Sequence, residues 1–240
     1  MPEFHPAPAR LPADRRVYAI GDIHGCLDRL RTLHDAIAAD LAARPVPAAV
    51  LIHLGDLVDR GPDSAQVVAH IATAPPPAGI TETLTLRGNH EAMMLAALDA
   101  PEQDHAALVW MQNGGADTLL SWGVSRRVEP RDWAAALPAA DLAFLRALPL
   151  SHRDGGYLFV HAGIRPGVPL DRQDPHDLMW IREPFLSSKL DHGAVVVHGH
   201  TPQPNPVLRA NRIGIDTGAV MGGALTCLVL EDDRLGFLLA

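Results

Sequence analysis

The chain has 240 residues, 48% hydrophobic but only 5% aromatic, so any core must be built mainly from aliphatic side chains. The formal net charge is −8 and no run of Lys and Arg forms a basic face, so we expect no nucleic-acid partner. No apolar run approaches the roughly 18 residues of a membrane-spanning helix, so no membrane partner is expected. The two cysteines, Cys26 and Cys227, are far apart, which suits a reducing compartment and predicts a cytoplasmic location.

The amino-terminal stretch MPEFHPAPARLPADRR contains four prolines and lacks the apolar segment of a secretory signal. We predict that residues 1–15 form a disordered arm or a strap along the surface. A chain of this length suits one large domain or two small ones. Because the motifs described below are spread over the remainder, we expect residues 16–240 to form a single domain.

Short apolar runs recur along the chain and predict strands buried on both faces. They lie at 17–20, 49–54, 83–86, 157–160, 194–197 and 225–230. Leucine or isoleucine at every third or fourth position of 27–41 predicts a helix, and further helices are expected at 64–73 and from 92 to 98. Residues 101–148 look mainly helical, with a break at Asn-Gly-Gly 113–115. Alternating strands and helices predict an α/β fold.

Polar residues flanked by glycine follow five of these apolar runs. The five motifs are GDIHG (21–25), GDLVDRGP (55–62), RGNHE (87–91), HAG (161–163) and HGHTP (198–202). Ligands of α/β proteins gather at the carboxyl ends of strands, where glycine allows sharp turns and close approach. Any one motif would more often be a simple turn, whereas five in series predict a shared site.

The candidate metal ligands in these motifs are Asp22, His24, Asp56, Asn89, His161 and His200. Three imidazoles, two carboxylates and an amide without a thiolate favour manganese, iron or zinc. Six ligands are too many for one open catalytic metal and suit two divalent cations that share a bridging ligand. Such a pair can bind a phosphoryl group and activate water for attack.

The motif series resembles the calcineurin-like metallophosphoesterases. More narrowly, it resembles their phosphoprotein phosphatase branch in the short bacterial and phage form, over about residues 17–230. The resemblance implies a sandwich of two mixed β-sheets flanked by helices. It also implies a dinuclear metal site at the strand ends, for which manganese is our expected metal.

The resemblance also implies a role for each motif residue. Asp22 and His24 would hold the first metal, Asp56 would bridge, and the second metal would be completed by Asn89, His161 and His200. A metal-bridging hydroxide would attack phosphorus, and His90, oriented by Asp59, would protonate the leaving oxygen. Arg60 and Arg182 would bind the phosphate. The chemistry of the residues agrees for Asp59, Arg60 and His90, since a leaving alkoxide needs a proton and a phosphoryl group needs donors.

Several roles stay open at this stage. Arg182 could instead form a surface salt bridge with Glu183 or Asp177. His198 and Asp216 could contact the metal ligands or only pack. A cysteine-based phosphatase would need arginine six residues after its nucleophile, but Thr32 and Asp233 occupy those positions.

We therefore predict a hydrolase of phosphoric monoesters, acting on phosphoserine or phosphothreonine of a phosphoprotein, or on a small phosphoester. One alternative is a dinucleoside polyphosphate hydrolase, for which variants such as GDLQG, VARG and GNHD would be expected. Here the corresponding stretches are GDIHG, VDRG and GNHE. Another alternative is a metal-binding interaction module without turnover.

Overall fold

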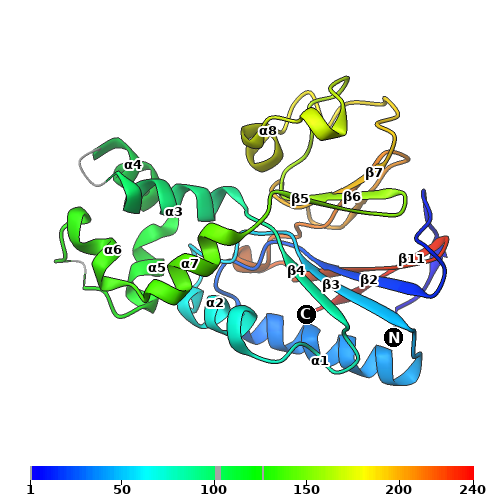
Figure 1. Cartoon of the computed structure of the whole chain (residues 1–240), viewed down its shortest axis with the longest axis horizontal. Helices are drawn as coiled ribbons and strands as arrows, with labels where there is room; N and C mark the ends of the chain where they lie inside the picture. Colours follow the sequence, from blue (N-terminus) through cyan, green and yellow to red (C-terminus); the bar gives the residue numbers. More distant parts are fainter. Residues whose placement is uncertain (1, 101–103, 126) are drawn as a thin grey trace.

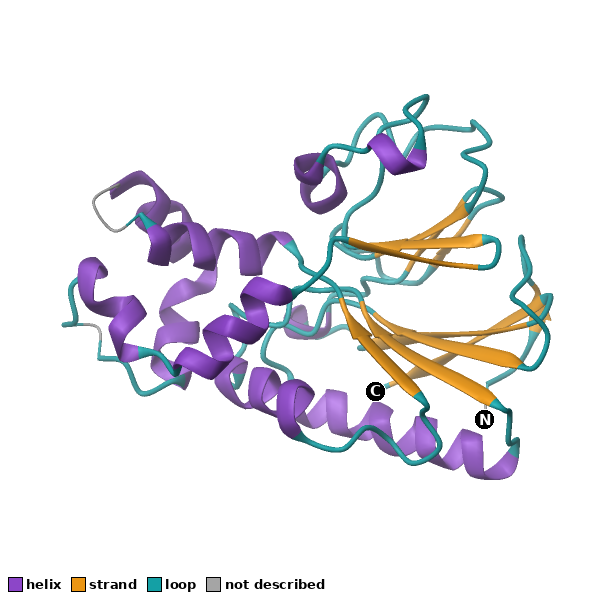
Figure 2. Ribbon diagram, in the orientation of Figure 1, coloured by secondary structure: helices purple, strands orange, loops and turns teal. Residues whose placement is uncertain are grey.

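The computed structural model describes residues 2–100, 104–125 and 127–240, and confirms an α/β sandwich of two mixed sheets flanked by helices (Figures 1 and 2). The first sheet has the order β1-β11-β10-β2-β3-β4 and the second has the order β5-β6-β7-β9-β8. The first sheet comprises β1 (His5–Pro6), β2 (Arg15–Ile20), β3 (Ala48–His53), β4 (Glu82–Thr85), β10 (Thr226–Glu231) and β11 (Arg234–Leu239). The second comprises β5 (Ser151–Asp154), β6 (Tyr157–Val160), β7 (Val195–His198), β8 (Val207–Leu208) and β9 (Arg212–Gly214).

Helices pack outside both sheets and form a lobe at one end (Figure 2). The long helix α1 (Leu27–Ala43) lies along the first sheet, and α8 (Pro175–Trp180) lies above the second. The lobe contains α2 (Ser64–Thr73), α3 (Asn89–Asp99), α4 (Asp104–Trp110), α5 (Ala116–Ser121), α6 (Trp133–Ala136) and α7 (Ala139–Ala147). In the described ranges, no helix combines the length and apolar character needed to cross a lipid bilayer.

Alternating side chains of the central strands enter two different apolar layers. In β2, Val17 and Ala19 face the layer between the sheets, whereas Tyr18 and Ile20 pack with α1 residues such as Leu33. The second sheet follows the same rule, because alternate residues of β6 enter the inter-sheet layer and the layer below α8. Burial on both faces explains why these strands are uninterrupted apolar runs in the sequence.

The expectation of burial on both faces is wrong for β4. This strand lies at the edge of the first sheet, and Glu82 and Thr83 are exposed. Because no described strand pairs with its outer side, its polar residues remain in solvent. The short strands β1, β5, β8 and β9 were not anticipated, since none of them carries an apolar run, and β11 was not anticipated either.

The helical region was anticipated only in outline, and positions 101–103 of it lie outside the described residues. The expected break at Asn-Gly-Gly is a kink within Met111–Gly115, between α4 and α5. Gly114 has φ of 107°, in the left-handed region that favours glycine. A side chain there would lie 2.6 Å from the backbone nitrogen of Arg60, so this break allows the lobe to approach the GDLVDRGP loop.

The amino-terminal segment lies along the first sheet. His5 and Pro6 pair with β11, and the amide of Ala7 donates to the carbonyl of Asp233 at 2.8 Å. The buried Leu11 packs into the inter-sheet layer, and Tyr157 donates its hydroxyl to the carbonyl of Ala9 at 2.7 Å. These contacts join the segment to strands of both sheets.

Strand direction determines where the polar motifs meet. Strands β2, β3 and β4 are parallel, as are β6, β7 and β9 in the other sheet. Their carboxyl ends meet beside the helical lobe (Figure 1). All five motifs therefore emerge at the same place.

Candidate metal centre

The six predicted metal ligands are all buried at this meeting point, with exposed fractions of at most 6%. They come from four loops and the first residue of a helix. Asp22 and His24 follow β2, Asp56 follows β3, Asn89 begins α3, and His161 and His200 follow β6 and β7. Both sheets thus contribute donor atoms, and the complete set of six requires loops from both of them.

Asp56 occupies the middle of the group. Its Oδ2 lies 3.5 Å from Nε2 of His24 and 3.4 Å from Nε2 of His161. Its Oδ1 accepts a hydrogen bond from the backbone amide of His90 at 3.0 Å. Two clusters with metal-ligand spacing share Asp56: one adds His24 and His90, and the other adds Asp22 and His161.

Asn89 joins the two histidines supplied by the second sheet. Its Oδ1 lies 2.9 Å from Nε2 of His161 and 2.8 Å from Nδ1 of His200. The backbone amide of His200 donates to the carboxylate of Asp22 at 3.1–3.2 Å, so both sheets are connected through this contact. The structure therefore brings all six predicted ligands together.

The loops that carry these residues have an unusual backbone conformation. Seven non-glycine residues in the described chain have positive φ, and five of them are predicted site residues: His24, Asp56, Asp59, Arg60 and His200. Such conformations cost roughly 1–3 kcal/mol each and cluster at functional sites. Gly199 permits another close approach, because a Cβ there would lie 2.0 Å from Oδ1 of Asp22.

Charge in the site is suited to cations. Burial, together with the nearby carboxylates Asp216 and Asp56, raises the pKa of Asp22 well above its usual value. Burial also lowers the pKa of His24 to about 4 and that of His200 to about 3, so both rings are neutral at pH 7 and available as metal ligands. Crowded carboxylates beside neutral imidazoles fit divalent metal ions.

His161 and Asp56 stabilise each other's charged forms. Burial disfavours the imidazolium of His161, but Asp56 and the other carboxylates outweigh it and raise its pKa to about 10. Conversely, although burial opposes ionisation of Asp56, His161 and His90 hold its pKa well below the usual value.

His90 and Asp59 form a buried pair next to this group. Nδ1 of His90 lies 2.7 Å from Oδ2 of Asp59, and its Nε2 lies 4.0 Å from Oδ2 of Asp56. Oδ1 of Asp59 accepts hydrogen bonds from Trp110 at 2.9 Å and Thr118 at 2.6 Å. Burial raises the pKa of Asp59, opposed by its bonds to His90, Thr118 and Trp110. These contacts fix the carboxylate and leave Nε2 of His90 free.

The two predicted phosphate-binding arginines are both exposed. Nη1 of Arg60 lies 3.0 Å from Nε2 of His24, and Arg182 is close enough to contribute to the lowered pKa of His200. The alternative salt bridges of Arg182 are absent from the described residues. Asp177 instead pairs with Arg165 at 2.6 Å, and Glu183 accepts a hydrogen bond from Ser187 at 2.5 Å.

The other residues left open by the sequence have different surroundings. Asp216 is buried, contributes to the raised pKa of Asp22 and accepts a bond from the amide of Gly218 at 3.0 Å. His198 is buried against Phe185, with a ring-centre separation of 5.1 Å, and belongs to neither metal-spaced cluster. Burial raises the pKa values of Cys26 and Cys227, which opposes thiolate formation.

Glu91 is an important site residue that the sequence analysis missed. Its buried carboxylate accepts hydrogen bonds from the backbone amides of Asp56, Leu57 and Gly88 at 2.7–2.9 Å, and from Val58 at 3.3 Å. It thereby joins the GDLVDRGP and RGNHE loops. Its position directly after Asn89 and His90 could have indicated this role, because a buried glutamate in the first turn of a helix requires hydrogen-bond donors around its carboxylate.

A family model described as calcineurin-like phosphoesterase matches residues 15–225, which is most of the chain. This protein is a calcineurin-like phosphoesterase. The match confirms the family predicted from the motifs and makes the chain a member of a hydrolase family. Calcineurin-like phosphoesterases use a dinuclear divalent metal site, and the two clusters sharing Asp56 lie where such a site is expected.

Two kinds of enzyme name occur among the curated relatives. Serine/threonine-protein phosphatase 1 of Salmonella typhimurium is 33% identical over 224 residues, covering 88% of this chain and 90% of that protein. A symmetrical bis(5'-nucleosyl)-tetraphosphatase of Methylococcus capsulatus is 36% identical over 154 residues, covering 62% of this chain and 44% of that protein. A crystal structure of a candidate diadenosine tetraphosphatase shares the fold, with a TM-score of 0.67 and 23% identity over 97% of this phosphoesterase and 98% of that chain.

Replacing Glu91 with Gln should destabilise the phosphoesterase by about 2–4 kcal/mol, because an amide would place a donor against backbone amides that now share a charged acceptor. Urea unfolding monitored by circular dichroism would measure the change. Glu129→Gln, at an exposed position, is the matched control and should leave the unfolding midpoint unchanged. Equal stability of the two variants would contradict a bracing role for Glu91.

Proposed function

We propose that this phosphoesterase is a metal-dependent phosphomonoesterase that acts on phosphoserine or phosphothreonine in proteins. The buried His90–Asp59 pair carries the proposal, because it supplies a proton donor for an alkoxide leaving group. The 33% identity to the Salmonella protein phosphatase, which extends over 90% of that protein, supports the same substrate class.

The six buried donors divide into two sets that would each hold one divalent cation. Asp22 and His24 would serve the first, and Asn89, His161 and His200 the second, with Asp56 contributing to both. The position of Asp56 between His24 and His161 supports its shared role, while the assignment of Asp22 beside His24 follows the family resemblance, since Asp22 also has ligand spacing with His161. When bound, such a cation pair supplies positive charge to the phosphoryl group and an activated water for attack. Manganese is our preferred metal, because the donors are nitrogen and oxygen atoms without thiolate.

His90 would hold its proton at Nε2, the ring nitrogen that Asp59 does not occupy. The bond from Asp59 to Nδ1 orients the ring and leaves Nε2 to face the leaving oxygen. Trp110 and Thr118 in turn hold the carboxylate of Asp59, so the lobe contributes to the position of the acid. Transfer of this proton to the leaving oxygen would yield the free hydroxyl of serine or threonine.

Arg60 and Arg182 would bind the non-bridging phosphate oxygens. Both are exposed, near His24 and His200 respectively, and neither forms a salt bridge within the described residues. A guanidinium group matches the geometry of a phosphate through paired hydrogen bonds. The absence of carboxylate partners leaves both side chains available for substrate.

A second candidate function is hydrolysis of dinucleoside polyphosphates. The 36% identity to the Methylococcus tetraphosphatase over 154 residues favours it. Hydrolysis of either substrate class would draw on the same cations and arginines, so the distinction depends on what surrounds the scissile group.

A direct comparison of substrates separates these functions. The manganese-loaded enzyme should release phosphate from phosphoserine and phosphothreonine peptides and from an aryl phosphate, with a higher kcat/KM for the peptides than for diadenosine tetraphosphate. Phosphate release and nucleotide chromatography would be measured in parallel. A clear preference for diadenosine tetraphosphate would establish the second candidate, and turnover of none of them would favour a non-catalytic module.

Removal of metal should abolish activity, because the proposed mechanism depends on two cations held by the six donors. Activity should return on addition of Mn²⁺, with approximately two ions bound per chain by elemental analysis. Full activity in a sample verified to be metal-free would contradict the two-cation proposal.

The variant His90→Asn should lower kcat by about 100- to 1,000-fold for a phosphoserine peptide, because general acid catalysis is typically worth about that much. The loss should be smaller for an aryl phosphate, whose leaving group is a weak base. Steady-state kinetics on both substrates would measure the difference, with metal content as a control for site integrity. Equal losses on both substrates would mean that His90 is not the proton donor.

Arg60→Ala should weaken product inhibition by inorganic phosphate roughly tenfold or more and also lower kcat, because one charge-assisted contact is lost. The exposed Arg131, in the helical lobe, provides a matched control. Arg131→Ala should change neither quantity. Unaltered phosphate inhibition in Arg60→Ala would remove Arg60 from the substrate site.

A further inference from the structure

We infer that this protein has a second phosphate-binding site, on the β8–β9 hairpin and the loop after β7, formed by Arg209, Arg212 and Thr201. Its lining includes none of the six candidate metal ligands and neither Arg60 nor Arg182. The ligand is the phosphate group of an organic phosphate or free phosphate. This site is separate from the proposed catalytic function and does not depend on it.

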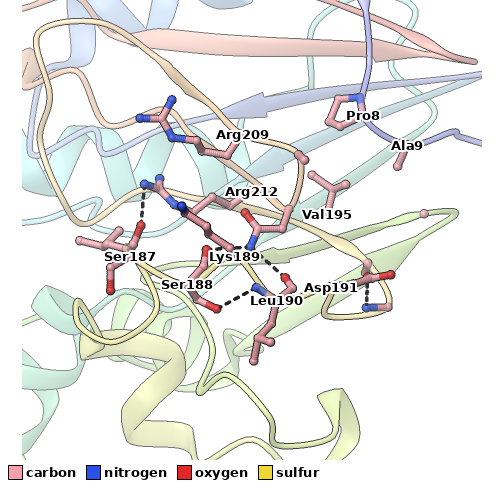
Figure 3. Close-up of a pocket in the computed structure, with 16 residues that line it drawn as sticks. Pro8, Ala9, Ser187, Ser188, Lys189, Leu190, Asp191, Val195, Arg209 and Arg212 are labelled. Atoms are coloured by element: carbon pink, nitrogen blue, oxygen red, sulfur yellow. Dashed lines mark hydrogen bonds between the residues drawn. The ribbon is translucent and has the colours of Figure 1, made fainter.

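Two arginines face each other across the hairpin. The backbone amide of Arg209 donates to the carbonyl of Arg212 at 2.9 Å, which closes the turn between β8 and β9. Both side chains extend toward the same side (Figure 3). Like charges at paired positions of a hairpin destabilise it. In a chain with net charge −8, such an arrangement favours a bound anion.

Arg212 is buried without a carboxylate partner. Its exposed fraction is 8%, and it donates to the carbonyl of Leu186 at 3.0 Å. Its Nη1 lies 3.3 Å from Nε2 of His198, and its Nε has no hydrogen-bond partner among the described residues. Glu183 is the carboxylate that acts on its pKa, but Glu183 is bound to Ser187 and forms no salt bridge with Arg212. Burying an unpaired charge is costly, so an anionic partner would stabilise the arginine.

The other arginine that is buried among the described residues shows how such a charge is normally matched. Arg16, 1% exposed, pairs with Glu231 at 3.0 Å and with Asp40 at 3.4 Å. No described carboxylate lies within 4.0 Å of Arg209 or Arg212 at the hairpin. The contrast indicates that the missing negative charge is supplied from outside the chain.

A small cavity lies beside the two arginines. It has a volume of about 190 Å³ and is lined by Arg209 and Arg212 together with Thr201, Gln203 and His198. The hydroxyl of Thr201 is buried and unpaired in the described structure, as is Nε of Arg212. Two unsatisfied polar groups on one cavity of this size suit an oxyanion, which accepts hydrogen bonds from both.

A larger cavity adjoins the small one and has room for an organic group. Its volume is about 1000 Å³, and it shares Arg209, Arg212 and Leu186 with the small cavity (Figure 3). Lys189, the chain's single lysine, adds a third cation to its lining, and Leu190 adds an exposed apolar side chain. The one carboxylate in the lining, Asp191, accepts from the amide of Gly193 at 2.8 Å.

Calorimetric titration of the metal-loaded protein tests this site. The probes are inorganic phosphate and phenylphosphonate, whose carbon–phosphorus bond resists phosphatases. We expect two binding events per chain, of which one matches the inhibition constant for aryl phosphate hydrolysis and the other does not. Tighter binding of phenylphosphonate at the second event would assign it to organic phosphates, and equal binding would assign it to free phosphate. A single event in the wild-type protein would overturn the inference.

Substitutions locate the second event. Arg209→Gln and Arg212→Gln should weaken it roughly tenfold or more, with the inhibition constant within about twofold of wild type. Arg131→Gln, an exposed arginine in the helical lobe, should retain both events. If Arg212→Gln fails to fold by circular dichroism, Arg209→Gln carries the test alone because Arg209 is exposed. A second event unaffected by Arg209→Gln would overturn the proposed location.

Discussion

The accumulation of buried carboxylates around Asp56 is the constraint on which the rest of the site depends. Asp22, Asp56, Asp216 and Glu91 are all at most 7% exposed, and burial raises the pKa of three of them. Buried charge is stable only when it is paired or solvated by donors. Backbone amides serve Glu91, imidazoles serve Asp56, and the dinuclear metal site of this family supplies the remaining positive charge.

The sandwich architecture makes this concentration of donors feasible. Parallel strands in each sheet direct their carboxyl ends to one place, so the loop after β2 faces the loop after β7. The amide of His200 reaches the carboxylate of Asp22 across this junction. The close approach of these loops requires positive φ at several of their residues, which is an energetically unfavourable backbone conformation. The two apolar layers on either side of the central strands stabilise the sandwich that holds the loops in place.

Two regions of the protein differ in whether their arginines are paired with carboxylates. Around Arg16, an internal network with Asp40 and Glu231 neutralises a buried guanidinium. At the β8–β9 hairpin, Arg209 and Arg212 have no equivalent partners in the described chain, which is the basis for the second anion site. The metal centre shows the opposite imbalance, an excess of carboxylates. Both imbalances therefore identify places where a ligand completes the structure.

Much of this protein could be predicted from the sequence because the relevant signals are local. An apolar run predicts a strand, leucine at helical spacing predicts α1, and a glycine-flanked acid or histidine marks a strand end. These patterns depend on chain neighbours, so the α/β class, the motif series and the convergence of all six candidate ligands followed from them. Several strands were missed because their local signal is weak; β5, for example, consists of polar residues.

Tertiary structure alone decided which distant residues support the site. Trp110 and Thr118 bind Asp59 because the kink at Gly114 lets the lobe approach the loop after β3. Glu91 joins two loops only because β3 and β4 are adjacent and parallel. Contacts of this kind depend on strand order and packing between elements. Sequence spacing therefore determined the chemistry at the strand ends, whereas packing determined how each group is held and charged.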